Sequence, residues 1–239
     1  MSQVLTLQTI KKSSVGRVLK KIARPVLPGW VDAGRFIVQT PHFRSLLQRV
    51  ARETPYVETI LNAGAGEGLY SPLLIKFSNA KQIVELDASF GGRHLTDPRQ
   101  RLVTASLTAL PVPSDSVDLI LCSEVLEHID ADERALSELA RVLSSGGWLL
   151  ISVPKPPAVY DPAHVREGYQ PEDLRAMLEE YDLEVVDIQF CMHAIFRFFL
   201  RTHRHGYVPR FLVFILSWLD RLLPFGEPMD LMMLARKTR

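Results

Sequence analysis

The chain has 239 residues, of which 47% are hydrophobic and 23% are charged, and its formal net charge is +1 at pH 7. This length suits one α/β domain with appendages, and the near-neutral charge argues against a dedicated nucleic-acid binder. Cys122 and Cys191 lie far apart without a metal-type spacing. We therefore expect no disulfide framework and no metal site, and we favour a reducing, cytoplasmic compartment.

Residues 1–40 are predicted to form a basic, amphipathic extension that precedes a domain spanning 41–239. Lysines and arginines crowd residues 11–24, apolar residues recur among them at helical spacing, and no acid occurs before Asp32. The stretch lacks the apolar run of a secretory signal, but a transit peptide would also be basic and acid-free. No apolar run in the chain approaches the ~18–20 residues that span a bilayer.

Beyond residue 40 the pattern alternates between helical and strand periodicity. We predict helices at 42–53, 67–77, 130–143 and 171–181, and strands at 57–61, 82–86, 101–105, 116–123, 148–153, 183–190 and 230–235. Gly146 and Gly147 are expected to cap the third helix. Alternating strands and helices imply right-handed crossovers and a mainly parallel, doubly wound α/β sheet.

The strongest signal for binding is a strand that runs into a glycine-rich turn, with glycines at Gly64, Gly66 and Gly68. Such a turn lets a ligand approach bare backbone, and a helix that follows directly would add free amides. A dinucleotide fingerprint would need glycine where Leu69 stands, and no P-loop tripeptide follows. A tight turn without a ligand is the alternative.

A carboxylate, Asp87, ends the strand that follows, about 20 residues past the glycines. In a doubly wound sheet this acid reaches the ligand crevice and accepts hydrogen bonds from ribose hydroxyls. Glu85 shares its strand face and competes for that role, but we prefer the residue nearer the strand end. The alternative is a solvated aspartate that caps the next helix.

Several motifs follow in order at residues 110–120, 123–129, 135–143 and 146–147. Together with the glycine turn, this succession resembles the type 11 branch of the class I S-adenosylmethionine-dependent methyltransferases, over about residues 58–153. The resemblance implies a Rossmann-like sheet of seven strands whose last strand is antiparallel. It also implies methyl transfer from S-adenosylmethionine.

The resemblance assigns roles to residues at the strand ends. The three glycines would hold the methionyl end of the cofactor and Asp87 its ribose, and Cys122, Ser123 and Glu124 would line the floor near the sulfonium. Ser106 and Leu107 would lie at the adenine edge. Two positions depart from the family pattern: Asn62 stands where an acid is usual, and Ser106 replaces an Asp. Asn62 keeps hydrogen-bonding capacity toward the cofactor but loses the charge.

Methyl transfer needs a base only when the acceptor must lose a proton, and the nearest candidates are Glu124 and His128. Alternatively, Glu127 and His128 order the loop. The segment His164–Tyr169 resembles a substrate-side loop, although a solvated connection would look the same.

Residues 191–229 are predicted to form a helical insertion, rich in aromatic and basic residues, between the last two strands. With the basic N-terminus, we expect it to seat the protein on an anionic membrane surface and admit a small or lipid-linked acceptor, methylated at oxygen. A lid or a homodimer interface is the alternative for this segment. A methyltransferase-fold scaffold that binds the cofactor poorly is the alternative function.

Overall fold

The computed structural model describes residues 31–77, 79–91, 94–157, 163–203 and 210–239. The chain divides into two compact units: the sheet unit contains 39–191 and 226–239, and the helical unit contains 1–38 and 192–225. The predicted basic N-terminal helix lies outside the described residues, and the boundary at residue 40 remains a prediction. Among the described residues, no helix combines the length and apolar character needed to cross a bilayer.

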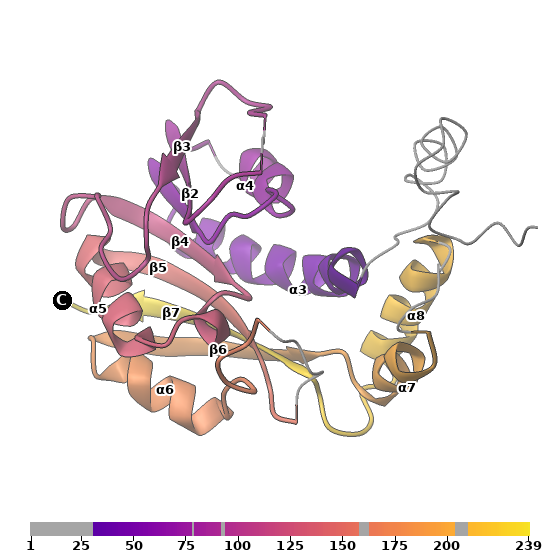
Figure 1. Ribbon diagram of the computed structural model, residues 1–239. Coiled ribbons are helices and arrows are strands. Elements are labelled where there is room, and N and C mark those ends of the chain that lie inside the picture. Colours follow the sequence, from indigo (N-terminus) through magenta and orange to yellow (C-terminus); the bar gives the residue numbers. More distant parts are fainter. Residues whose placement is uncertain (1–30, 78, 92–93, 158–162, 204–209) are drawn as a thin grey trace, which may run out of the picture. The chain divides into compact units, whose positions relative to one another are not determined.

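The sheet unit is built on seven strands in the order β3-β2-β1-β4-β5-β7-β6 (Figure 1). Their bounds are β1 Thr59–Ala63, β2 Gln82–Asp87, β3 Gln100–Thr104, β4 Val117–Ser123, β5 Leu143–Pro154, β6 Leu183–Cys191 and β7 Asp230–Lys237. The first five strands pair in parallel, whereas β7 runs antiparallel to both of its neighbours. The predicted Rossmann-like sheet with an antiparallel last strand is confirmed.

Helices cover both faces of this sheet. They are α3 Val31–Glu53, α4 Ser71–Phe77, the short 3-10 helix η1 Leu126–His128, α5 Asp132–Val142 and α6 Pro171–Glu179. Buried leucines of α5 and α6 share one core with alternate residues of the strands, such as Leu61 and Ile151. On α3, Phe43 is fully buried and meets the Tyr70 ring edge-to-face at 4.9 Å. Burial on both faces explains why the strands read as near-continuous apolar runs.

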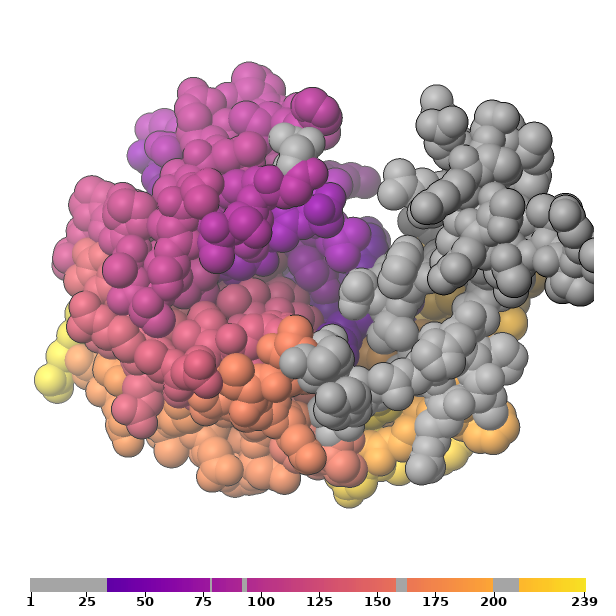
Figure 2. Space-filling model, viewed as in Figure 1, coloured from indigo at the N-terminus to yellow at the C-terminus, as the bar shows by residue number. Residues whose placement is uncertain are grey.

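The helical unit contains α7 Ala194–His203 and α8 Arg210–Leu222, which lie in the segment predicted as an insertion. Figure 2 shows the space-filling surface of the described residues in the colours of the sequence. Within this unit, Asp220 of α8 accepts hydrogen bonds from the backbone N–H groups of Met192 and His193, at 3.0 and 2.8 Å. This buried carboxylate therefore ties α8 to the start of α7.

Two helix starts differ from prediction. Helix α3 begins at Val31 rather than His42 and carries Pro41 in its interior. Because proline has no N–H to donate within a helix, a helix that starts after Pro41 was the simpler expectation. Helix α4 begins at Ser71 rather than Glu67, because Gly68 has a φ of +79° that no right-handed helix accommodates. The predicted α4 helix start directly after the glycines is therefore wrong.

The predicted helix cap at Gly146 and Gly147 is also wrong. Helix α5 ends at Val142, and Leu143 follows in an extended conformation as the first residue of β5. The register between β4 and β5 explains why glycines occur here. Val117 pairs with Leu143, but Leu119, two residues later, pairs with Trp148, so β5 contains extra residues at this point. Gly146, with a φ of +75°, lies within this irregularity of the ladder, where a left-handed residue re-aims the strand.

Candidate cofactor and active site

The turn between β1 and α4 presents bare backbone at the carboxyl end of the sheet. The N–H groups of Gly64 and Ala65 both donate to the Leu86 carbonyl, at 2.8 and 2.9 Å, which anchors the turn to β2. A Cβ atom at Gly64 would lie 2.2 Å from Cγ2 of Val125, whereas at Gly66 it would meet no atom of the described residues within 4 Å. The turn is therefore packed on one side and open on the other, as a cofactor cradle requires.

Asp87 lies opposite this turn at the end of β2. Its Oδ2 accepts the Gly66 N–H at 2.8 Å and its Oδ1 accepts the Ser89 N–H at 3.1 Å. Glu85 is fully buried, and its carboxylate accepts hydrogen bonds from Asn62 Nδ2 at 2.7 Å and Gln100 Nε2 at 2.6 Å. The geometry thus favours Asp87 over Glu85 as the acid that faces a ligand, and it directs the Asn62 amide into the sheet.

The segment predicted at the adenine edge is held in place from α5. Ser106 is exposed and its Oγ lies 2.8 Å from Thr108 Oγ1, whereas Leu107 is buried in the core. Glu138 Oε2 accepts the N–H of Leu110, and Arg141 donates to the Leu110 carbonyl. Hydrogen bonds from Arg141 lower the pKa of Glu138 to about 2.

The end of β4 carries a buried polar network. Ser123 Oγ lies 2.8 Å from Ser152 Oγ, and Ser152 in turn donates to Glu124 Oε1 at 3.0 Å. Gln39 of α3 also donates to Glu124 Oε1, at 3.1 Å, and to Asp230 Oδ2 at 3.0 Å. Glu124, whose φ is +55°, is thus positioned by two other elements.

Gln39, Ser152 and Asp230 were missed as members of this network. Ser152 and Asp230 interrupt or border apolar strands, which was a usable signal. No local pattern marks Gln39, which is fully buried and whose Oε1 accepts the Tyr70 hydroxyl.

Cys122, which precedes these residues, packs into the hydrophobic core. Burial, followed by the negative charges of Glu127 and Glu124, raises the pKa of its thiol far above the ordinary value. The thiol therefore stays protonated, and Cys122 serves packing.

Beyond β4, helix η1 carries two ionisable residues, the buried Glu127 and the exposed His128. His128 Nδ1 lies 3.0 Å from the Ala163 carbonyl oxygen, and the Val165 N–H donates to the Glu127 carbonyl at 3.0 Å. The predicted substrate-side loop is therefore docked on η1.

Residues 61–151 match a family model described as a methyltransferase domain, of type 11. This part of the chain is therefore similar to type 11 methyltransferase domains. S-adenosylmethionine is the cofactor of the class I methyltransferases that it resembles. The matched residues include the glycine turn, Asp87 and the end of β4, which are the parts that the geometry brings together.

The chain is also similar to several curated proteins. A probable S-adenosylmethionine-dependent methyltransferase of Mycobacterium tuberculosis is 31% identical over 145 residues, covering 55% of this chain and 50% of the relative. A malonyl-[acyl-carrier protein] O-methyltransferase of Methylococcus capsulatus is 34% identical over 114 residues, covering 45% of this chain and 42% of that protein. The chain thus spans about half the length of the curated relatives it matches.

Solved structures show the same fold. The 1,6-didemethyltoxoflavin-N1-methyltransferase of Burkholderia thailandensis, crystallised with S-adenosylhomocysteine, superposes with a TM-score of 0.52 at 18% identity. The superposition covers 82% of this chain and 78% of that one.

Proposed function

We propose that this protein transfers the methyl group of S-adenosylmethionine to an oxygen of a small or lipid-linked acceptor at an anionic membrane surface. The observation that carries the cofactor part is the contact between Asp87 and the Gly66 amide beside open backbone. Methylation at oxygen is supported by the name of the Methylococcus relative, a malonyl-[acyl-carrier protein] O-methyltransferase.

The chain's own contribution to this reaction is alignment. S-adenosylmethionine supplies an electrophilic methyl group on a cationic sulfur. Gly66 leaves room for the cofactor against the main chain, Gly64 lets the turn pack on Val125, and Asp87 would accept hydrogen bonds from the ribose hydroxyls. Holding the acceptor in line with the methyl group can supply ~7–11 kcal/mol without a covalent catalyst.

The two candidate bases differ in their surroundings. The Glu124 carboxylate accepts hydrogen bonds from Gln39 and Ser152, which suits it to positioning. His128 is exposed, and because the Ala163 carbonyl can only accept, the proton of a neutral ring lies on Nδ1. Its Nε2 then keeps a lone pair. We therefore propose His128 for proton removal and Glu124 for shaping the floor.

The helical unit supports the membrane part of the proposal. Five of its aromatic side chains, each at least 53% exposed, are Phe198, Phe211, Phe214, Trp218 and Phe225. Residues 192–225 also contain five arginines, at positions 197, 201, 204, 210 and 221, against a single acid, Asp220, which is buried. Exposed aromatic rings and an excess of cations suit an anionic lipid interface, where each cation contributes ~1 kcal/mol.

Calorimetry with S-adenosylhomocysteine tests the cofactor site. We expect binding by the full chain, a loss of at least about tenfold for Asp87→Asn because a charged hydrogen-bond acceptor is removed, and no change for the exposed Asp173→Asn on α6. If the unaltered chain does not bind S-adenosylhomocysteine, the alternative function, a scaffold with the methyltransferase fold, is supported instead.

Co-sedimentation tests the membrane surface. Vesicles of phosphatidylcholine with phosphatidylglycerol should retain the protein, and vesicles of phosphatidylcholine alone should retain less. The double variant Phe211→Ser, Trp218→Ser should lose binding, whereas Tyr56→Ser, which removes a ring that is 84% exposed on the sheet unit, should keep it. Equal retention on both vesicle types, or by the double variant, would exclude this role.

A further inference from the structure

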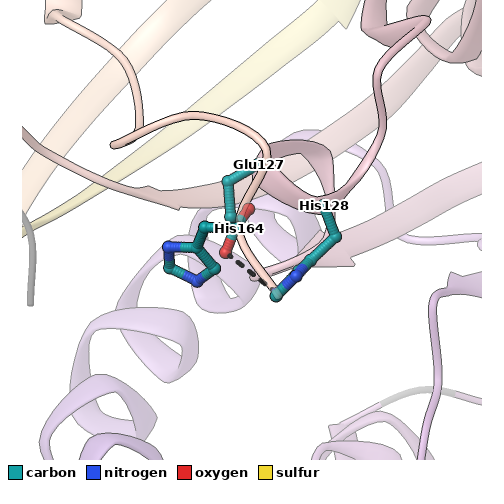
Figure 3. Close-up of side chains that lie close together, drawn as sticks. All are labelled: Glu127, His128 and His164. Carbon is teal, nitrogen blue, oxygen red and sulfur yellow. Dashed lines mark ion pairs between the residues drawn. The ribbon is translucent and has the colours of Figure 1, made fainter. Parts of the chain in front are cut away.

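Three ionisable side chains converge beside η1 although they come from two separate segments (Figure 3). One ligand atom each of Glu127, His128 and His164 lies within 4.8 Å of the others. Nε2 of His128 is 3.8 Å from Oε1 of Glu127, and the two imidazole rings meet edge-to-face at 4.6 Å between centroids. Glu127 is fully buried, His164 is half-buried and His128 is exposed, so the cluster has a protein side and a solvent side.

The His128 ring is oriented as a metal ligand would be. Its Nδ1 faces the Ala163 carbonyl at 3.0 Å, which leaves Nε2, the atom on the Glu127 side, with the lone pair. A ligating histidine usually donates its other N–H to a carbonyl or carboxylate in this way, which fixes the ring and raises its basicity.

The segment that carries His164 is held by contacts that do not involve the cluster's own side chains. Arg166 pairs with Asp132 at 2.5 Å and donates to the Ile129 carbonyl at 3.0 Å. The Tyr169 hydroxyl donates to Asp132 at 2.8 Å. These contacts place His164 against η1 before any ion binds, so the site is largely preorganised.

We propose that Glu127, His128 and His164 bind one divalent transition-metal ion of the Zn²⁺ type. Two imidazoles and one carboxylate suit such ions, whereas Mg²⁺ and Ca²⁺ prefer oxygen ligands. Ligand bonds of ~2.0–2.2 Å require the three atoms to approach one another by roughly 1 Å, which side-chain rotation allows. Three protein ligands leave a fourth position open toward solvent, as catalytic zinc sites do.

The site adjoins the cofactor turn, because Val125, two residues before Glu127, lies against Gly64. This consequence rests on the proposed function: an acceptor hydroxyl at the open position becomes more acidic and releases its proton to water. The oxygen keeps the electron pair of the broken O–H bond and forms the new bond to the methyl carbon, while the C–S pair leaves with sulfur. In this form of the reaction the ion replaces His128 as the means of removing the proton.

Titration of the tag-free full chain with ZnCl₂ tests the site by calorimetry. We expect one equivalent to bind, and His128→Ala and His164→Ala should each weaken binding by more than the ~10–100-fold that loss of a supporting hydrogen bond causes. The exposed His94→Ala is the matched control and should bind as the unaltered chain does. Co²⁺ substitution should give visible absorption that disappears in His164→Ala.

Unchanged affinity in His164→Ala, or no binding by the unaltered chain, would overturn the site. Circular dichroism checks that each variant folds, and because His164 lies on a loop its replacement keeps the test valid even if variants at the buried Glu127 fail to fold. If the chain binds S-adenosylhomocysteine but not Zn²⁺, only the proposed metal site is wrong. If it binds Zn²⁺ but not S-adenosylhomocysteine, the proposed methyl transfer is wrong and the metal site is retained.

Discussion

The sheet unit and the helical unit distribute apolar surface in opposite ways. In the sheet unit the large apolar side chains of the central strands, such as Leu150 and Trp148, are fully buried. On α8, residues at helical spacing such as Phe211, Ile215 and Trp218 are exposed, whereas Ser217 and Asp220 are buried. A helix whose apolar stripe faces outward indicates a surface for binding, while the buried strands provide stability.

The buried polar side chains of the two units also differ in what they do. In the sheet unit, buried polar side chains gather at the carboxyl edge of the strands, where Gln39 connects Glu124 and Asp230. In the helical unit, the buried Asp220 serves local structure, because it accepts the N–H groups of Met192 and His193, which directly precede α7. Burial of polar groups thus marks a candidate site in one unit and a structural tie in the other.

The sharpest contrast should come from truncating one large side chain in each unit. Leu150→Ala should lower the free energy of unfolding by about 2–5 kcal/mol, because it leaves a cavity in a fully buried strand. Trp218→Ala, at a position 61% exposed, should change it by less than about 0.5 kcal/mol. Urea unfolding followed by circular dichroism measures both, and a large loss for Trp218→Ala would show that the stripe is part of a core.

Two glycines of the cofactor turn separate packing from binding. Gly64→Ala should cost about 1–3 kcal/mol more stability than Gly66→Ala, since both require a positive φ but only the first meets Val125. Gly66→Ala should fold and yet lose affinity for S-adenosylhomocysteine, because its methyl group enters the open side. Equal melting temperatures for the two variants, or full affinity in Gly66→Ala, would contradict this division.

The hydrogen bonds of Asp220 in the helical unit can be removed without altering the sheet unit. Asp220→Ala removes the acceptor of two buried N–H groups and should destabilise the helical unit by about 1–3 kcal/mol. Hydrogen exchange should accelerate in α7 and α8 while affinity for S-adenosylhomocysteine is retained. Asp173→Ala serves as the control, and unaltered exchange in Asp220→Ala would refute the tie.

The smallest effect concerns pH and the sheet unit alone. The lowered pKa of Glu138 means that its ion pair with Arg141 stabilises the fold fully above the ordinary carboxyl pKa of ~4.3. This contribution fades as the pH falls through about 2. Glu138→Gln should therefore lower the free energy of unfolding at neutral pH by about 1 kcal/mol or less. The difference between the variant and the unaltered chain, measured by urea unfolding, should shrink as the pH falls. A gap independent of pH would contradict this account.

Local patterns predicted most of the fold because strand and helix periods are written in consecutive residues. The seven strands, the glycine turn and the position of Asp87 follow from such patterns. The contacts of Gln39 and the meeting of His164 with Glu127 could not be predicted, since each joins segments far apart in the chain. The early start of α3 was missed because packing of the residues around Pro41 outweighs the local preference.

The placement of β7 between β5 and β6 has a consequence for how this chain can be rebuilt. Cys191 and Asp230 are ladder partners, and the Met229 N–H donates to the Cys191 carbonyl, so the two ends of residues 192–229 are clasped together. Loop closure depends only weakly on length, so a graft of another size can replace this segment without disturbing strand register. Because Gln39 donates to both Asp230 and Glu124, the hydrogen bonds at the end of β4 would stay fixed in such a graft.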